Sequence, residues 1–181
     1  MPPSFSQTSS KIKRILIIII FFVLSLTATL AGVLTPLSSA EINTRNNDLK
    51  QLQTNVRNMD VLHRSASIFQ NNMLICLISF IPVVGPVFGY YVLYNTGVYI
   101  AAESLAHAPP VAPILVILVL FIYPFTWLEF LAYSTALSES FLLIWRTIKG
   151  KGTKELANAG ILILICAALL ALGAVIEAIL I

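Results

Sequence analysis

The sequence is poor in charged residues. Only 10% of its 181 residues are Asp, Glu, Lys or Arg, whereas 58% are hydrophobic, and the mean hydropathy is +0.90. A soluble domain carries about 25% charged residues. The scarcity of charge therefore excludes an ordinary soluble domain and indicates an integral membrane protein with the lipid bilayer as a partner, since about 20 consecutive apolar residues suffice for one crossing.

Residues that bind metals or form disulfides are also scarce. Both cysteines, Cys76 and Cys166, lie inside apolar runs, where a free cysteine behaves as a small hydrophobe, so we expect no disulfide. The histidines are His63 and His107, and there is no CxxC or HExxH motif. We therefore expect no metal site.

Signatures of enzymes and of nucleic-acid-binding proteins are missing. The sequence has no nucleophile–base pattern, phosphate loop or dinucleotide fingerprint, so no catalytic residue, cofactor or enzymatic activity is predicted. The net charge of +3 is small, and no basic patch is interleaved with aromatic residues. We therefore expect no nucleic-acid partner.

Long apolar runs separated by polar segments are what the sequence does contain. Residues 1–14 are polar and end in a basic cluster, which predicts a disordered basic tail. Residues 15–34 form the first predicted transmembrane span, and the basic cluster before it predicts a cytoplasmic N-terminus. Ser38-Ser39-Ala40 could also be a signal-peptide cleavage site, but the apolar run exceeds the ~7–15 residues of a signal-peptide core, which favours an uncleaved anchor.

Residues 35–68 are predicted to be an extracytoplasmic amphipathic segment. Apolar residues recur there at helical spacing, and Asn43 or Thr44 could cap the helix. This helix could pack on top of a helical bundle or lie flat on the membrane surface, and both interpretations remain open. The recurring residues are Leu49, Leu52, Val56, Met59 and His63.

Residues 69–181 are predicted to be a membrane helical domain with two interruptions. The first lies in the block Met73–Ala102 and predicts a tight turn between two short spans or a re-entrant hairpin. The second is Pro124 in the block Val111–Trp145, where we expect a kink in one long helix. The helix-breaking residues of the first interruption are Pro82, Gly85, Pro86 and Gly89.

The basic loop 146–154 sets the expected number of crossings. Basic loops face the cytoplasm, so this loop and the N-terminus should lie on the same side of the membrane and be separated by an even number of crossings. Dividing only the block that contains Pro82–Gly89 satisfies this condition. The prediction is an all-α, polytopic transmembrane bundle of about five spans in the cell membrane, with an extracytoplasmic C-terminus.

Glu129 is the sharpest candidate for a functional residue, because a carboxylate inside an apolar run is costly and needs a partner. Polar residues at helical spacing on two helices should face each other instead of lipid. We therefore expect an intramembrane polar clamp, with a proton or ion relay, or contact with a partner subunit, as alternatives. The clamp candidates are Glu129, Asn95, Thr96, Tyr99 and Tyr133, while Glu139 is expected near Arg146 or Lys149.

Three stretches together resemble the stage II sporulation protein M family over about residues 66–180. They are Ile68–Asn72, a glycine-rich span that ends at Tyr94–Gly97, and Tyr123–Glu129. The last is similar to the family's Pro-His-Gly-x-x-Glu element. Phe125 stands where the family has His, and Thr126 where it has Gly, so no role that needs the histidine is carried over.

The resemblance implies a five-span protein with a cytoplasmic N-terminus. In spore formers, members of this family act as a membrane scaffold in a complex that remodels the cell wall, and the family also resembles the permease halves of ABC-type exporters. We therefore expect a non-catalytic membrane scaffold or accessory subunit that binds other membrane protein subunits. The alternatives are a permease or transporter subunit, or a small structural subunit of a membrane-embedded enzyme complex.

Overall fold

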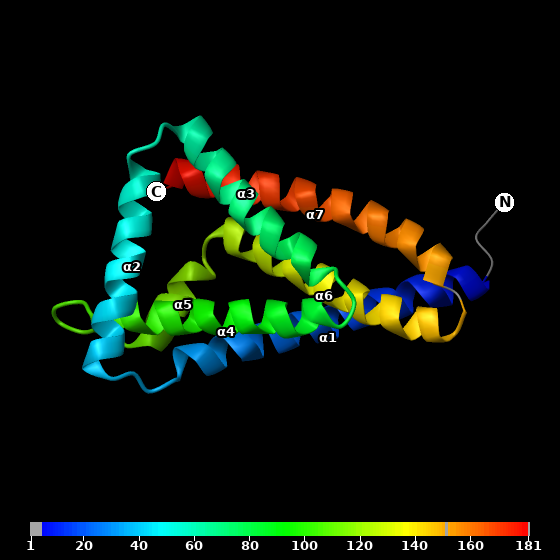
Figure 1. Ribbon diagram of the computed structural model, residues 1–181, viewed down its shortest axis with the longest axis horizontal. Helices are drawn as coiled ribbons and strands as arrows, with labels where there is room; N and C mark the ends of the chain where they lie inside the picture. The colour runs from blue at the N-terminus through cyan, green and yellow to red at the C-terminus, as the bar shows by residue number, and fades with distance from the viewer. Residues whose placement is uncertain (1–4, 151, 181) are drawn as a thin grey trace.

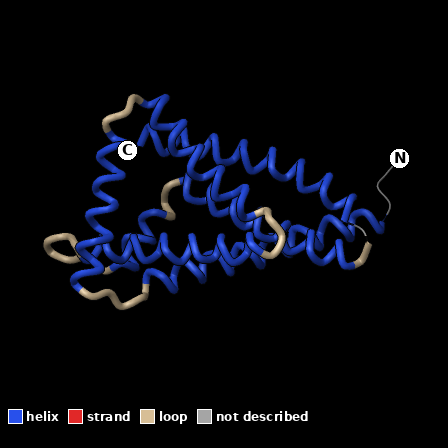
Figure 2. Tube along the Cα trace, in the orientation of Figure 1, coloured by secondary structure: helices blue, strands red, loops and turns tan. Residues whose placement is uncertain are grey.

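The computed structural model describes residues 5–150 and 152–180, with the backbone alone described for residues 5–11, 153 and 154. These residues form seven helices and no strand, which confirms the all-α class (Figures 1 and 2). The helices are α1 (Phe5–Val33), α2 (Ser39–Arg57), α3 (Val61–Ser79), α4 (Val84–Leu105), α5 (Pro113–Leu120), α6 (Pro124–Ile148) and α7 (Gly152–Leu180).

The long helices run back and forth between two ends of the molecule (Figure 1). The start of α1 and the connection between α6 and α7 lie at one end, which we call the basic end because it holds Lys13, Arg14, Arg146 and Lys149. The C-terminal part of α7 lies at the other end, beside α2, which stands across the bundle. We call this the α2 end.

Fewer helices qualify as membrane spans than the five expected. Ile12–Val33 in α1 and Glu155–Leu180 in α7 are long and apolar enough to cross a membrane, and α5 with α6 would add a third as a broken span. α3 and α4 do not qualify, because polar residues such as Gln70, Asn72 and Asn95 lower their hydropathy. α5 does not cross alone, since its eight residues span only about 12 Å.

The two qualifying helices expose their apolar side chains. Ile15, Leu16 and Ile19 of α1 are each more than half exposed, and Leu164 of α7 is 71% exposed. A soluble protein rarely leaves contiguous apolar surface of this kind uncovered. The exposure is consistent with membrane association, in which lipid covers these faces.

α1 begins earlier than the sequence suggested. Residues 5–14, part of the segment expected to be a disordered tail, are helical, and residues 1–4 lie outside the described residues. No proline or glycine interrupts residues 5–31, so a helix nucleated in the apolar run can propagate back toward the N-terminus.

The interruption expected at Pro82–Gly89 is present. α3 ends at Ser79, and residues 80–83 form a tight turn before α4 begins at Val84. Val83 has φ +69° and ψ −54°, and the Val84 N–H donates to the Pro82 carbonyl at 2.8 Å. This is a γ-turn of the rare, strained form. Pro82 lies in the turn, whereas Gly85, Pro86 and Gly89 lie within α4.

The interruption at Pro124 is larger than the expected kink. α5 and α6 are separate helices bent by 89°, so the single long helix expected here is corrected to two. Pro124 begins α6, where its missing N–H costs nothing. The side chains of Thr126 and Trp127 donate to the carbonyls of Leu120 and Phe121 at 2.7 and 2.8 Å, so the start of α6 is bonded to the end of α5 across the break.

α1 and α4 cross at two glycines. A Cβ on Gly32 would lie 2.0 Å from the Tyr94 carbonyl oxygen, and a Cβ on Gly97 would lie 2.0 Å from the Thr29 carbonyl oxygen. Only glycine lets the two backbones approach this closely. Elsewhere Cys76 and Cys166 are both free and buried, in a core shared by α3, α6 and α7.

α2 occupies the segment expected to be amphipathic, but it begins at Ser39 instead of near the caps expected at Asn43 or Thr44. Ser38 caps it: its hydroxyl accepts from the Glu41 N–H, and the Glu41 carboxylate accepts from the Ser38 N–H at 2.9 Å. This capping box satisfies two backbone donors of the first turn. The hydrogen bonds from Ser38 lower the pKa of Glu41.

Polar contacts hold α2 against α4. The Arg45 guanidinium lies over the Tyr99 ring, 5.0 Å from its centroid, and also reaches the Asn95 side-chain oxygen at 3.5 Å. Gln53 donates to Glu103 at 3.1 Å. No residue of α2 is buried, so α2 is attached to the bundle chiefly through side-chain polar groups rather than an apolar core.

Candidate functional site

A cavity of about 330 Å³ opens at the α2 end, and we call it the acidic cavity. Side chains from α1, α2, α4, α5, α6 and α7 line it. Half of its fourteen lining residues are apolar, and the polar ones converge on the same space, as polar groups do in ligand sites. The polar lining residues are Thr29, Thr96, Tyr99, Glu103, Thr126, Glu129 and Glu177.

Glu129 of α6 lies at the meeting point of three helices. Its Oε1 accepts from the Asn72 side-chain amide of α3 at 2.5 Å. Glu177 of α7 lines the same cavity as Glu129. The hydrogen bond between Asn72 and Glu129 joins α3 to α6 near the α2 end, and Glu177 of α7 faces the same cavity.

The other clamp candidates lie around this centre in different ways. Thr96 and Tyr99 line the acidic cavity together with Glu129, and Tyr133 is buried in the core one helical turn further along α6. Asn95 points elsewhere, since its amide donates to the Tyr91 carbonyl at 2.9 Å. Among the contacts of the described residues, the hydrogen bond to Glu129 comes from Asn72 and not from α4.

Sequence reasoning did not single out Asn72 as the partner of Glu129. Asn72 was noted only as the end of the stretch Ile68–Asn72 that resembles the stage II sporulation protein M family. The signal available was an amide followed directly by an apolar run, since a side-chain amide at membrane depth needs a partner. The partner's identity follows only from the packing of α3 against α6.

A second polar centre lies at the basic end, and we call it the four-charge cluster: Arg14, Glu139, Arg146 and Glu155. The guanidinium of Arg14 donates one N–H to Glu139 and another to Glu155. The Arg146 Nε lies 3.1 Å from Glu155 Oε2. Both glutamates are 0% exposed, so α1, α6 and α7 meet around fully buried carboxylates.

The chemistry of the four-charge cluster favours arginine at its centre. A guanidinium offers several N–H donors in a planar fork, so one Arg14 side chain can bind two carboxylates at once. Removing one member would leave buried charge without compensation. The sequence predicted Glu139 near Arg146 or Lys149, but not its partner Arg14, which lies 125 residues earlier in the chain.

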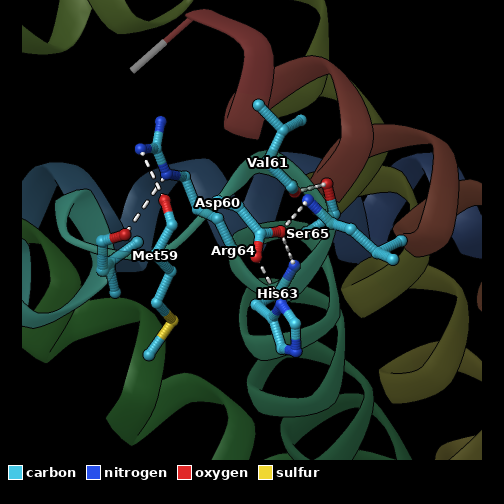
Figure 3. Close-up of polar contacts among 8 residues, drawn as sticks. Met59, Asp60, Val61, His63, Arg64 and Ser65 are labelled. Atoms are coloured by element: carbon cyan, nitrogen blue, oxygen red, sulfur yellow. Dashed lines mark hydrogen bonds and ion pairs between the residues drawn. The ribbon is translucent and has the colours of Figure 1, made fainter.

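A third set of contacts fixes the connection between α2 and α3 (Figure 3). Arg64 donates to the carbonyls of Val56, Arg57 and Met59, all near the end of α2, and to that of Ala178 in α7 at 3.1 Å. A cationic donor suits these carbonyls, because the last carbonyls of a helix lack intrahelical partners. Arg64 thus ties the loop to the C-terminal part of α7.

Asp60 caps the N-terminus of α3 in the same region (Figure 3). Its carboxylate accepts from the backbone N–H groups of Leu62 and His63, both at 3.0 Å, and lies 2.6 Å from the His63 Nδ1. The hydrogen bonds from the His63 backbone and side chain lower the pKa of Asp60. The cap therefore favours the charged carboxylate.

In the part of the chain that the structure describes, no group of three His, Cys, Asp or Glu side chains is placed to hold a metal ion. No protein-family profile matches the sequence, and no curated protein or solved structure matches it either. The resemblance to the stage II sporulation protein M family therefore stays a prediction.

Proposed function

We propose that the chain is an integral membrane scaffold or accessory subunit without catalytic activity of its own. In this proposal α1, α3, α4, the broken pair α5–α6, and α7 cross the membrane, giving five crossings. The N-terminus and the α6–α7 connection face the cytoplasm, and the C-terminus and α2 lie outside. The placement of α1's start and the α6–α7 connection at the same end supports this topology (Figure 1).

The observation that carries the proposal is the four-charge cluster. It joins the first and last long helices to α6 through fully buried ionic contacts at the basic end. At the α2 end, the bond between Asn72 and Glu129 joins α3 to α6. Polar contacts at both ends hold the helices in one arrangement, which suits a protein that holds partner subunits in place.

A permease or transporter subunit is the second candidate, and the acidic cavity favours it. Glu129 and Glu177 could carry a proton or a cation there, since ionisable groups at membrane depth commonly serve transport. Transport also needs a path to the other side. The acidic cavity shares no lining residue with the groove found at the basic end, so a scaffold is the better supported of the two.

Glu129→Gln separates the two candidates. The glutamine keeps a carbonyl oxygen that can accept from Asn72, so a structural clamp should retain its fold and its co-purifying subunits. A relay would lose proton or cation flux in proteoliposomes while the protein still folds. Asn72→Leu is the matched variant, because it removes the hydrogen bond and keeps the carboxyl. The scaffold proposal fails if Glu129→Gln abolishes a measurable flux.

Assembly is tested by gentle extraction in a mild detergent followed by affinity purification. A scaffold, or a structural subunit of an enzyme complex, should co-purify with other membrane proteins in fixed proportion. Migration as a lone monomer would count against both. Weakening the four-charge cluster with Arg14→Gln should release those partners, whereas the neighbouring exposed Lys13→Gln should not.

Topology is tested by labelling single cysteines in intact cells. The native thiols Cys76 and Cys166 are buried and can be replaced by alanine to leave a silent background. Asp48→Cys on α2 and Lys149→Cys at the end of α6 each place a thiol at an exposed position. We expect an impermeant reagent to label position 48 only. Labelling of position 149 alone would show that the protein has the opposite orientation in the membrane.

A further inference from the structure

The acidic cavity holds several acids and no base. Its volume of about 330 Å³ lies within the range of roughly 300–1,000 Å³ typical of small-molecule sites. The carboxyl side chains of Glu103, Glu129 and Glu177 line it, and no lysine, arginine or histidine is among its described lining residues. The cavity is therefore an acid-rich space that could hold a small organic molecule.

Two of these acids have no basic partner within the described residues. None of the ion pairs there includes Glu129 or Glu177, and the one side-chain hydrogen bond to Glu129 comes from a neutral amide of α3. Two arginines at the α2 end are engaged elsewhere, since Arg45 lies over an aromatic ring and Arg64 donates to backbone carbonyls. A carboxyl group at membrane depth is costly without compensation, so it must hold a proton or a cation from outside the chain.

Aromatic rings supply a second reason to expect a cation. Tyr99, Phe121, Phe125 and Phe130 line the cavity, and aromatic rings attract cations that lie within about 6 Å of their centroids. The chain itself makes such a contact, because the Arg45 guanidinium lies 5.0 Å from the centroid of the Tyr99 ring. Within the described residues no set of three metal-binding side chains is placed to hold a metal ion. Carboxyl groups beside aromatic rings therefore favour an organic cation, whose carbon atoms contact the rings.

An apolar groove of about 200 Å³ adjoins the acidic cavity, and Ile117 and Phe121 line both. The other side chains of this groove are also hydrophobic, and its Leu118 and Trp127 are 60% and 49% exposed. In the membrane placement proposed above, such exposed apolar side chains contact lipid. A ligand with an apolar portion could therefore reach the acidic cavity from the lipid, past Ile117 and Phe121.

We propose that the acidic cavity binds a hydrophobic organic ammonium ion, with its N–H groups at Glu129 and Glu177 and its apolar part against Ile117 and Phe121. An ammonium group offers three N–H donors, so one ligand can bind two carboxyl groups through charge-assisted hydrogen bonds. Binding needs no passage across the membrane, so the proposal goes beyond the scaffold function and is compatible with it. It rests on the proposed membrane placement only for the route of entry.

The test measures binding of radiolabelled 2-phenylethylammonium to the full chain in neutral detergent by a scintillation proximity assay. We expect saturable binding, against which 2-phenylethanol, the neutral molecule of the same shape, competes at least about tenfold more weakly. Glu177→Gln should weaken binding about tenfold while leaving the hydrogen bond between Asn72 and Glu129 in place. Asp48→Asn is the charge-matched control and should change nothing, because Asp48 is exposed and outside the lining.

Two tryptophan substitutions on α2 test where the ligand binds. Leu49→Trp fills the cavity, whereas Gln51→Trp places the same bulk at an exposed position outside the lining. No residue of α2 is buried, so both variants should fold, and circular dichroism checks this. We expect Leu49→Trp alone to abolish binding. Thr96→Trp fills the cavity from α4 should Leu49→Trp displace α2.

Three results would overturn the proposal. The first is the absence of saturable binding, which would show that the carboxyl groups hold protons alone. The second is equal competition by 2-phenylethanol, which would indicate an apolar site without selection for charge. The third is binding unchanged by Glu177→Gln and by both cavity-filling variants, which would place the ligand elsewhere. Co-purification of partner subunits is measured separately, so failure of the ligand site and failure of the scaffold proposal are distinguishable.

Discussion

Arg14→Met is the substitution that tests the four-charge cluster most directly. Methionine keeps an unbranched side chain but removes the guanidinium that binds both Glu139 and Glu155. Among the ion pairs of the described residues, Arg146 is paired with Glu155 and not with Glu139, so Glu139 loses the ionic partner that the structure gives it. Two fully buried carboxylates would then share the site with one cation, Arg146, which contacts Glu155.

The expected loss of stability follows from the burial of these groups. Both glutamates are 0% exposed and Arg14 is 20% exposed. Removing one partner of a buried ion pair costs about 3–5 kcal/mol, because the remaining charge is uncompensated. Since Arg146 stays beside Glu155 and Arg14 is partly exposed, we expect the lower end of that range, about 3 kcal/mol.

Two controls make this interpretation specific. Lys13 is the adjacent basic residue and is exposed, so Lys13→Met should change the free energy of unfolding by no more than about 0.5 kcal/mol. Glu139→Leu combined with Arg14→Met removes both charges of one pair. The double variant should lose less than the sum of the single variants, by about 0.5–3 kcal/mol.

The assay is equilibrium unfolding in mixed micelles, where an increasing fraction of denaturing detergent reduces the helical circular dichroism signal. The free energies of unfolding of the native protein, Arg14→Met, Glu139→Leu and the double variant form a double-mutant cycle. Equal stability of Arg14→Met and Lys13→Met would refute the buried cluster. Strict additivity in the double variant would show that Arg14 and Glu139 do not interact.

Three further predictions concern the backbone and a helix cap, each checked by thermal unfolding in detergent. Gly97→Ala should lower the free energy of unfolding by about 1–3 kcal/mol, because the added Cβ would lie 2.0 Å from a carbonyl oxygen of α1. Gly160→Ala is the control, and since nothing lies within 4 Å of its Cβ it should be neutral or slightly stabilising. Equal effects of the two substitutions would contradict the α1–α4 crossing. Val83→Gly should raise the melting temperature, because glycine adopts φ +69° without strain, and a lower melting temperature would contradict the turn geometry. Asp60→Asn keeps a capping oxygen but cannot ionise. Since the pKa of Asp60 is lowered in the folded state, the native protein should be more stable than this variant above about pH 4, and the difference should be lost as the pH falls through the folded pKa. A stability difference that grows in acid would contradict the cap.

Local features of the structure could be predicted because they depend on neighbouring residues. Long apolar runs with little charge predicted helices and membrane association, and seven helices form in the described residues. Proline is disfavoured in a helix interior, so interruptions near Pro82 and Pro124 were expected, whereas Pro86 is accommodated near the start of α4. The angle of 89° at Pro124 was not, because it depends on the packing of α5 against other helices.

The membrane count shows where sequence patterns reach their limit. Basic segments predicted five crossings, yet within residues 5–150 and 152–180 two helices qualify on length and hydropathy, or three with the broken pair. Polar residues of α3 and α4, such as Asn72 and Asn95, lower the hydropathy of their own helices. Whether such a helix lies in lipid depends on the neighbours that satisfy its polar groups, and those neighbours are distant in the sequence.

By itself the sequence determined the helical class, the apolar surfaces and the positions of the breaks, since each depends on residues within a few turns of one another. Only the tertiary structure decided which charges meet. Arg14 binds Glu139 and Glu155 across 125 and 141 residues, and Asn72, rather than a residue of α4, binds Glu129. The physical reason is that a buried charge must find a partner, but periodicity and composition do not specify which distant helix will carry that partner to it.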